Sequence, residues 1–188
     1  RNIDWNAYAR WKQLVLKLFV EEEDLHVHLL VDCTLSMDWG SPCKFDVARQ
    51  LTAGLAYLAL ANLDRAGVVP LGYSKQPIWR PTRGRGKFLA LLRYLAQCEV
   101  ESDSNCLSDV VRKWTDTRPR RGLTILLSDL WGRDEEDIFR ALDLLRHARQ
   151  EVAILQVLHP DELSVDGRGD YDLVDRETGH SRKVLIDP

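Results

Sequence analysis

Residues 24–38 read D-L-H-V-H-L-L-V-D-C-T-L-S-M-D and join a dense apolar run to a cluster of side-chain oxygen atoms. The apolar run, 25–31, has the length and the β-branched content of a strand that is covered on both faces. Asp32, Thr34 and Ser36 follow it at alternate positions. Because ligands of open α/β sheets bind beyond the carboxyl ends of the strands, the sequence predicts a polar site that begins at Asp32.

A second dense apolar run, 123–127, repeats this pattern and ends in Ser128 and Asp129. Loops from neighbouring parallel strands splay apart where the strand order reverses, so we expect the two runs to flank one crevice. A polar turn with Ser104 at its centre is expected to close that crevice. The predicted site is an all-oxygen set, made of Asp32, Thr34, Ser36, Ser104 and Asp129. Hard divalent cations such as Mg²⁺ or Mn²⁺ prefer such ligands, so the set predicts a divalent-metal site.

The rest of the chain alternates helical and extended patterns. Apolar spacing predicts helices at 44–62, 87–97, 105–117 and 134–149, and strands at 68–73 and 151–158. A short strand at 76–80 is expected to pair antiparallel with 68–73, and segments 171–174 and 183–186 predict a hairpin at a sheet edge. Residues 1–23 form an N-terminal extension whose apolar pattern fits both a strand and a helix. This alternation predicts an α/β fold with a mainly parallel sheet and helices on both faces.

Length and composition limit the number of domains and the kinds of partner that the chain could bind. A chain of 188 residues is long enough for one α/β domain, and we expect a single domain over 1–188. Its 26 Lys and Arg against 29 Asp and Glu carry no electrostatic footprint of nucleic-acid or anionic-membrane binding. The 4 cysteines lack C-x-x-C spacing, which predicts reduced thiols in a cytoplasmic protein. No run approaches the roughly 20 apolar residues of a membrane span.

The motif D-C-T-L-S at 32–36 resembles the D-x-S-x-S signature of von Willebrand factor A-type domains. Their metal-ion-dependent adhesion site combines that motif with a Thr from a second loop and an Asp from a third. The chain is more closely similar to a bacterial group of that fold, the von Willebrand factor A-like proteins of domain-of-unknown-function family fifty-eight. That resemblance is carried by R-x-I-D-W at 1–5, an acidic segment at 22–25 and S-D at 128–129, and it spans nearly the whole chain.

The resemblance implies roles for the site residues. Thr34 and Ser36 would bind the metal directly, Ser104 would stand where the family has Thr, and Asp32 and Asp129 would hold metal-bound waters. A sixth position would be left for an acidic side chain of a partner. The implied function is a non-catalytic protein-interaction module, an adaptor or co-chaperone that acts with a MoxR-type AAA+ ATPase.

Trp39 and Trp131 each follow one of the loops that carry the predicted metal ligands. Aromatic side chains at the rim of a binding face are frequent anchors in protein interfaces, so we expect a partner to contact them. Packing in the core is the alternative for both. Cys33 and Cys106 lie close to the same loops in sequence and are expected to be small packing residues.

Three alternatives compete with the metal-dependent interaction module. A haloacid-dehalogenase-type phosphohydrolase would use Asp32 as its nucleophile, although Thr34 stands where those enzymes carry the general acid. A scaffold that has lost its metal would account for Thr34 and Ser104 in place of the usual Ser and Thr. A third possibility is that the polar residues after the first strand serve only as turn residues that satisfy backbone groups.

Overall fold

The computed structural model describes residues 8–10, 12, 24–72, 77–101, 106–131, 134–163, 169–174 and 181–186. The N-terminal extension predicted at 1–23, apart from residues 8–10 and 12, and the predicted site residue Ser104 therefore lie outside the described residues. In the part of the chain that is described, no helix is long and apolar enough to cross a membrane.

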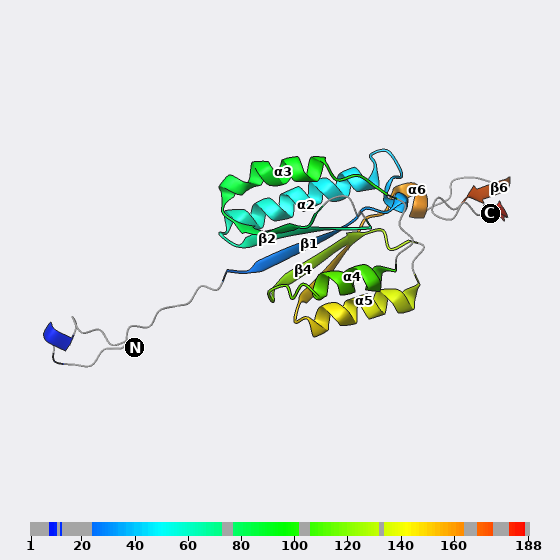
Figure 1. The fold of residues 1–188 in the computed structure, drawn as a ribbon. Helices are drawn as coiled ribbons and strands as arrows, with labels where there is room; N and C mark the ends of the chain where they lie inside the picture. The colour runs from blue at the N-terminus through cyan, green and yellow to red at the C-terminus, as the bar shows by residue number, and fades with distance from the viewer. Residues whose placement is uncertain are drawn as a thin grey trace.

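A five-stranded sheet with the order β3-β2-β1-β4-β5 forms the centre of the domain (Figure 1). Strand β1 (His26–Asp32) lies between β2 (Arg65–Leu71) and β4 (Leu123–Ser128) and pairs with both in parallel. Strand β5 (Glu151–Gln156) continues the parallel order on β4, whereas β3 (Trp79–Arg83) is antiparallel to β2. The predicted α/β class with a mainly parallel sheet is confirmed.

Helices cover both faces of this sheet (Figure 1). Helices α2 (Lys44–Ala61) and α3 (Phe88–Ala96) lie on one face, and α4 (Leu107–Thr115) and α5 (Glu135–His147) lie on the other. Two buried apolar clusters result: one contains Leu29 and Val31 of β1, and the other contains Leu30. Because successive side chains of a strand point to opposite faces and both faces of β1 are covered, the strand is apolar at Val27 and from Leu29 to Val31, which explains the dense apolar run in the sequence.

Some element boundaries differ from the predicted ones. Strand β2 begins at Arg65 and not at residue 68, because Arg65, Ala66 and Gly67 pair in register with the start of β1. Strand β3 lies at Trp79–Arg83 and not at 76–80, although its antiparallel pairing is confirmed. Backbone pairing, which the apolar pattern does not report, sets these limits.

The C-terminal hairpin is confirmed, but its predicted place is wrong. Among the described residues, strands β6 (Gly169–Val174) and β7 (Ser181–Ile186) pair with each other in a separate two-stranded sheet, while β3 and β5 form the edges of the main sheet. A short helix, α6 (Pro160–Leu163), precedes the hairpin and follows β5. A hairpin pattern in the sequence indicates local pairing and carries no information about the sheet that the hairpin joins.

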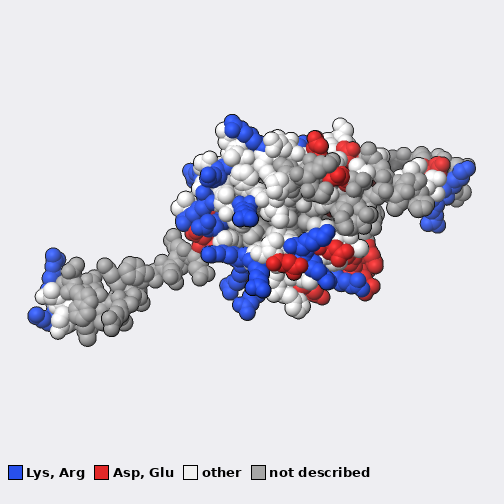
Figure 2. All heavy atoms as spheres, viewed as in Figure 1, with Lys and Arg blue, Asp and Glu red and all other residues white. Residues whose placement is uncertain are grey.

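Charged side chains are distributed unevenly over the domain. Figure 2 shows one face, on which Lys and Arg gather toward the end of the sheet where β1 begins. There Asp24 contacts two arginines, with its carboxylate 3.3 Å from Arg65 Nε and 3.0 Å from Arg83 Nη1. The predicted polar site lies at the opposite ends of the strands, away from this basic region.

Candidate functional site

Asp32 ends β1 and is completely buried. Its Oδ1 accepts hydrogen bonds from the backbone N–H of Thr34 at 3.1 Å and from Thr34 Oγ1 at 2.9 Å. Its Oδ2 accepts a hydrogen bond from Ser128 Oγ, at the end of β4, at 2.5 Å. The carboxylate therefore joins the carboxyl ends of the two central strands, which the sequence predicted to flank one crevice.

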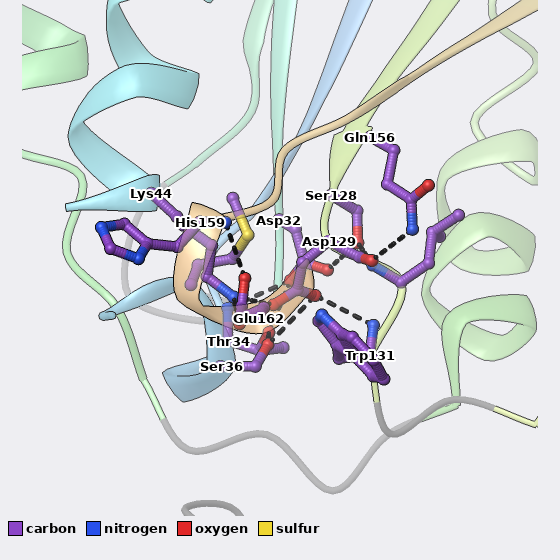
Figure 3. A network of polar contacts seen from close by, with 12 residues as sticks. Asp32, Thr34, Ser36, Lys44, Ser128, Asp129, Trp131, Gln156, His159 and Glu162 are labelled. Carbon is purple, nitrogen blue, oxygen red and sulfur yellow. Dashed lines mark hydrogen bonds and ion pairs between the residues drawn. The ribbon is translucent and has the colours of Figure 1, made fainter. Parts of the chain in front are cut away.

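The hydroxyl groups of Thr34 and Ser36 lie side by side beyond β1 (Figure 3). Their oxygen atoms are 3.0 Å apart. A 3₁₀ turn at Leu35–Met37, closed by a hydrogen bond from Met37 N to Thr34 O at 3.1 Å, brings the two residues together. Ser36 Oγ also donates a hydrogen bond to Asp129 Oδ1 at 3.3 Å, so the first loop contacts the loop that follows β4.

Asp129 is 1% exposed and accepts several hydrogen bonds. Besides Ser36, the backbone N–H of Trp131 donates to its Oδ1 at 3.1 Å. Its Oδ2 lies 2.8 Å from Lys44 Nζ. The structure thus brings Asp32, Thr34, Ser36 and Asp129 together, as the sequence predicted.

Two charged residues that the sequence analysis missed complete the described part of the site. Lys44 begins α2, is 2% exposed and forms ion pairs with Asp129 and with Glu162 of α6, the second at 2.5 Å. The sequence carried a signal for Lys44, because it falls four positions before Ala48, which belongs to the buried stripe of the helix. No comparable signal marked Glu162, which approaches from a short helix 118 residues later in the chain.

Trp39 and Trp131 are 46% and 47% exposed, so neither side chain is part of the core. Both follow the loops that hold the site residues, and Figure 3 shows Trp131 next to Asp129.

Cys33 is buried as predicted, and burial raises the pKa of its thiol above the ordinary range. Cys106 is exposed just before α4, so its prediction as a packing residue is wrong.

The arrangement of the hydroxyl groups fits a hard divalent cation. Mg²⁺ binds oxygen at about 2.0–2.1 Å in an octahedron, whose neighbouring ligands are therefore about 3 Å apart. The hydroxyl oxygen atoms of Thr34 and Ser36 have that separation, 3.0 Å, and each hydroxyl is hydrogen-bonded to a buried carboxylate. Among the described residues, no group of three or more His, Cys, Asp or Glu is placed to hold a metal, so the fit depends on the hydroxyl groups.

His26 and His28 lie at the other end of β1, away from this site. Burial is the main cause that lowers the pKa of both imidazoles below the ordinary value of 6.5. His28 is 3% exposed, and its Nε2 lies 3.1 Å from the carbonyl oxygen of Arg120. For His28, both features are those of a packed histidine.

These two histidines predict a loss of stability at mildly acidic pH. Their pKa is lower in the folded than in the unfolded state, so the unfolded chain binds more protons below about pH 6.5. We expect the free energy of unfolding in urea to be highest above that pH and to fall as the pH decreases toward the folded-state pKa values. His28→Gln, which retains a hydrogen-bond donor, should make the free energy of unfolding decrease less as the pH is lowered. A difference between wild type and variant that is the same at every pH would contradict this assignment.

A family model described as "Protein of unknown function DUF58" matches residues 1–187. The uncharacterized protein Rv1480 of Mycobacterium tuberculosis (strain ATCC 25618 / H37Rv) is 28% identical over 195 residues, which cover 100% of this chain and 60% of that protein. Our chain thus spans 60% of the length of the curated relatives that it matches.

Two solved structures share the fold. The conserved hypothetical protein BatB from Bacteroides thetaiotaomicron superimposes with a TM-score of 0.55 at 14% identity, over 86% of this chain and 80% of BatB. An aerotolerance-related membrane protein from Bacteroides fragilis NCTC 9343 gives a TM-score of 0.56 at 16% identity, over 87% and 82% of the two chains. The fold is the von Willebrand factor A-like fold that the sequence resemblance implied.

Proposed function

Since this chain belongs to the family of proteins of unknown function DUF58, we propose that it is a non-catalytic module that binds an acidic side chain of a partner protein through Mg²⁺ or Mn²⁺. Thr34 and Ser36 would hold the cation directly, and Asp32 and Asp129 would hold its water ligands. The cation would supply a Lewis-acidic position for a carboxylate from outside the domain. Ser104 is proposed as a further ligand.

One observation carries this proposal: the hydroxyl oxygen atoms of Thr34 and Ser36 lie 3.0 Å apart. Each hydroxyl is hydrogen-bonded to a carboxylate, Thr34 to Asp32 and Ser36 to Asp129. The hydrogen bonds of Asp32 hold the loop in this position, because they engage both the backbone N–H and the hydroxyl of Thr34. The exposed indoles of Trp39 and Trp131 support the proposal, since they place apolar contact area next to the polar site.

The partner is proposed to be a MoxR-type AAA+ ATPase, as the sequence resemblance implies, with this chain as its adaptor or co-chaperone. The direct check is to mix the purified chain with the MoxR-type ATPase of the same organism and to follow complex formation by analytical ultracentrifugation. We expect a complex in millimolar Mg²⁺ that dissociates in EDTA. Complex formation that is the same in both buffers would contradict the metal-dependent contact.

A metal-free interaction scaffold is the second candidate, and the ion pair between Lys44 and Asp129 favours it. The ammonium group lies 2.8 Å from the carboxylate and already neutralises one buried negative charge. A phosphohydrolase is favoured less, because Asp32 is completely buried and both of its oxygen atoms accept hydrogen bonds. A nucleophile has to reach its substrate.

Thermal unfolding separates the metal-dependent module from the scaffold. Mg²⁺ at about ten times its dissociation constant stabilises a folded protein by about 1.4 kcal/mol, which raises the Tm of a domain of this size by roughly 3–6 °C. We expect this rise for the wild type in comparison with EDTA buffer, and no rise for Ser36→Ala. Ser181→Ala, at an exposed serine of β7, is the matched control and should behave as the wild type does. Equal melting temperatures of the wild type in both buffers would favour the scaffold.

A further inference from the structure

Lys44 holds a position that the proposed function leaves unexplained. Its Nζ atom lies between two carboxylates, 2.8 Å from Asp129 Oδ2 and 2.5 Å from Glu162 Oε1 (Figure 3). The side chain is 2% exposed, although an unpaired lysine is almost never found inside a protein. A fixed positive charge therefore lies beside a carboxylate that the proposed divalent cation also requires.

We propose that Lys44 is a built-in counter-ion that competes with the divalent cation for Asp129, and that Glu162 retains the ammonium group when the cation is bound. This inference rests on the proposed function, because it assumes a cation at Thr34 and Ser36. It adds a regulation of that site: the affinity for the metal depends on how readily the ion pair between Lys44 and Asp129 breaks.

Competition follows from the geometry of Asp129. Its Oδ1 already accepts hydrogen bonds from Ser36 and from the backbone of Trp131, and its Oδ2 contacts Lys44. The carboxylate is 1% exposed, so water screens the repulsion between two nearby cations only weakly. The ammonium group and a divalent cation therefore cannot both interact fully with Asp129.

Glu162 is suited to keep the ammonium group paired. Its Oε1 is already the closer of the two carboxylate contacts, and its Oε2 accepts a hydrogen bond from the backbone N–H of His159 at 2.8 Å. This second bond orients the carboxylate toward Lys44 independently of Asp129. Because a buried cation has to remain paired, Lys44 can leave Asp129 only if Glu162 stays in place.

His159, the residue just before α6, contacts the loop around Trp39. The backbone N–H of Ser41 donates to His159 Nε2 at 3.3 Å. The His159 ring packs so closely on Gly40 that a Cβ atom at Gly40 would lie 2.2 Å from it. The ion pair of Lys44 thus links the metal position to α6 and to the loop that carries the exposed Trp39.

The experiment is a double-mutant cycle on the affinity for Mn²⁺ alone, measured by isothermal titration calorimetry of the full chain. Lys44→Met should bind Mn²⁺ at least about tenfold more tightly than wild type, since it removes a positive charge beside the site. Glu162→Gln should bind it more weakly, because Lys44 then depends on Asp129. Lys44→Met combined with Glu162→Gln should match Lys44→Met alone. Lys113→Met, at an exposed lysine of α4, is the matched control and should leave the affinity unchanged.

The alternative outcomes are distinct. Equal affinities of the wild type and Lys44→Met would overturn the competition and leave the metal site itself intact. If Glu162→Gln weakened binding equally in the Lys44→Met background, Glu162 would act through its own charge and the proposed transfer of the ammonium group would be wrong. Absence of Mn²⁺ binding in every variant would overturn the proposed function together with this inference. Should Lys44→Met not fold, Lys44→Gln, whose amide can donate to Asp129, carries the same prediction.

Discussion

Replacement of Lys44 by methionine is expected to lower the free energy of unfolding in metal-free buffer by about 3–5 kcal/mol, the usual cost of leaving a buried charge without its partner. Methionine fills nearly the volume of the lysine stem, so no large cavity contributes to this loss. The cause would be Asp129, which is 1% exposed and forms an ion pair with Lys44. Unfolding in urea, followed by circular dichroism, measures the effect.

The same explanation predicts a rescue. Asp129→Asn in the Lys44→Met background removes the unpaired charge and should recover a large part of the lost stability. Lys113→Met, at an exposed position, should change the free energy of unfolding by less than about 0.5 kcal/mol. A Lys44→Met protein as stable as the wild type would show that the ion pair adds nothing to the fold.

The second large effect is expected at Gly122, just before β4. A Cβ atom there would lie 2.0 Å from the carbonyl oxygen of His26 and 2.8 Å from its carbonyl carbon. These are backbone atoms of β1, so no side-chain rotation relieves the contact, and Gly122 O is also bound by Glu151 N of β5 at 2.8 Å. We expect Gly122→Ala to destabilise the domain by about 3 kcal/mol, the upper end of the usual cost of overpacking.

Gly54 provides a control in which the same substitution, glycine to alanine, is expected to have the opposite effect on stability. It lies in the interior of α2, is exposed, and has no atom within 4 Å of the position of an added Cβ. Gly54→Ala should therefore stabilise the protein by about 0.4–1 kcal/mol, because alanine restricts the unfolded chain and suits a helix. Urea unfolding of the two variants measures both changes. A Gly122→Ala variant within about 0.5 kcal/mol of the wild type would show that β1 and β4 can move apart at little cost.

The central strands and their polar ends could be predicted because the signals are local. Residues 25–31 and 123–127 are mostly apolar, as expected of strands covered on both faces, and an acidic residue follows each run within two positions. The structure confirms the pair as β1 and β4, in parallel register with Leu29 opposite Ile125. Asp32 and Asp129 therefore meet at one edge of the sheet, as the sequence indicated.

The start of β2 and the position of the hairpin could not be predicted in this way. Arg65 and Gly67 have no strand-like character, and they belong to β2 because His26 and His28 of β1 lie opposite them. Strands β6 and β7 show hairpin signals in sequence, but whether they join the main sheet depends on which sheet edge is available. Pairing partners are set by the assembled sheet and are not encoded in either segment alone.

The sequence by itself determined the α/β class, the two central strands and the oxygen-rich ends that form the candidate site, because a strand buried on both faces and the loop after it leave patterns within a few residues. Only the tertiary structure decided the electrostatics of that site. Lys44 and Glu162 are 118 residues apart and meet only after α2 and α6 have packed around the ends of the strands. A charge pair that distant acts through space and not along the chain, so no local pattern records it.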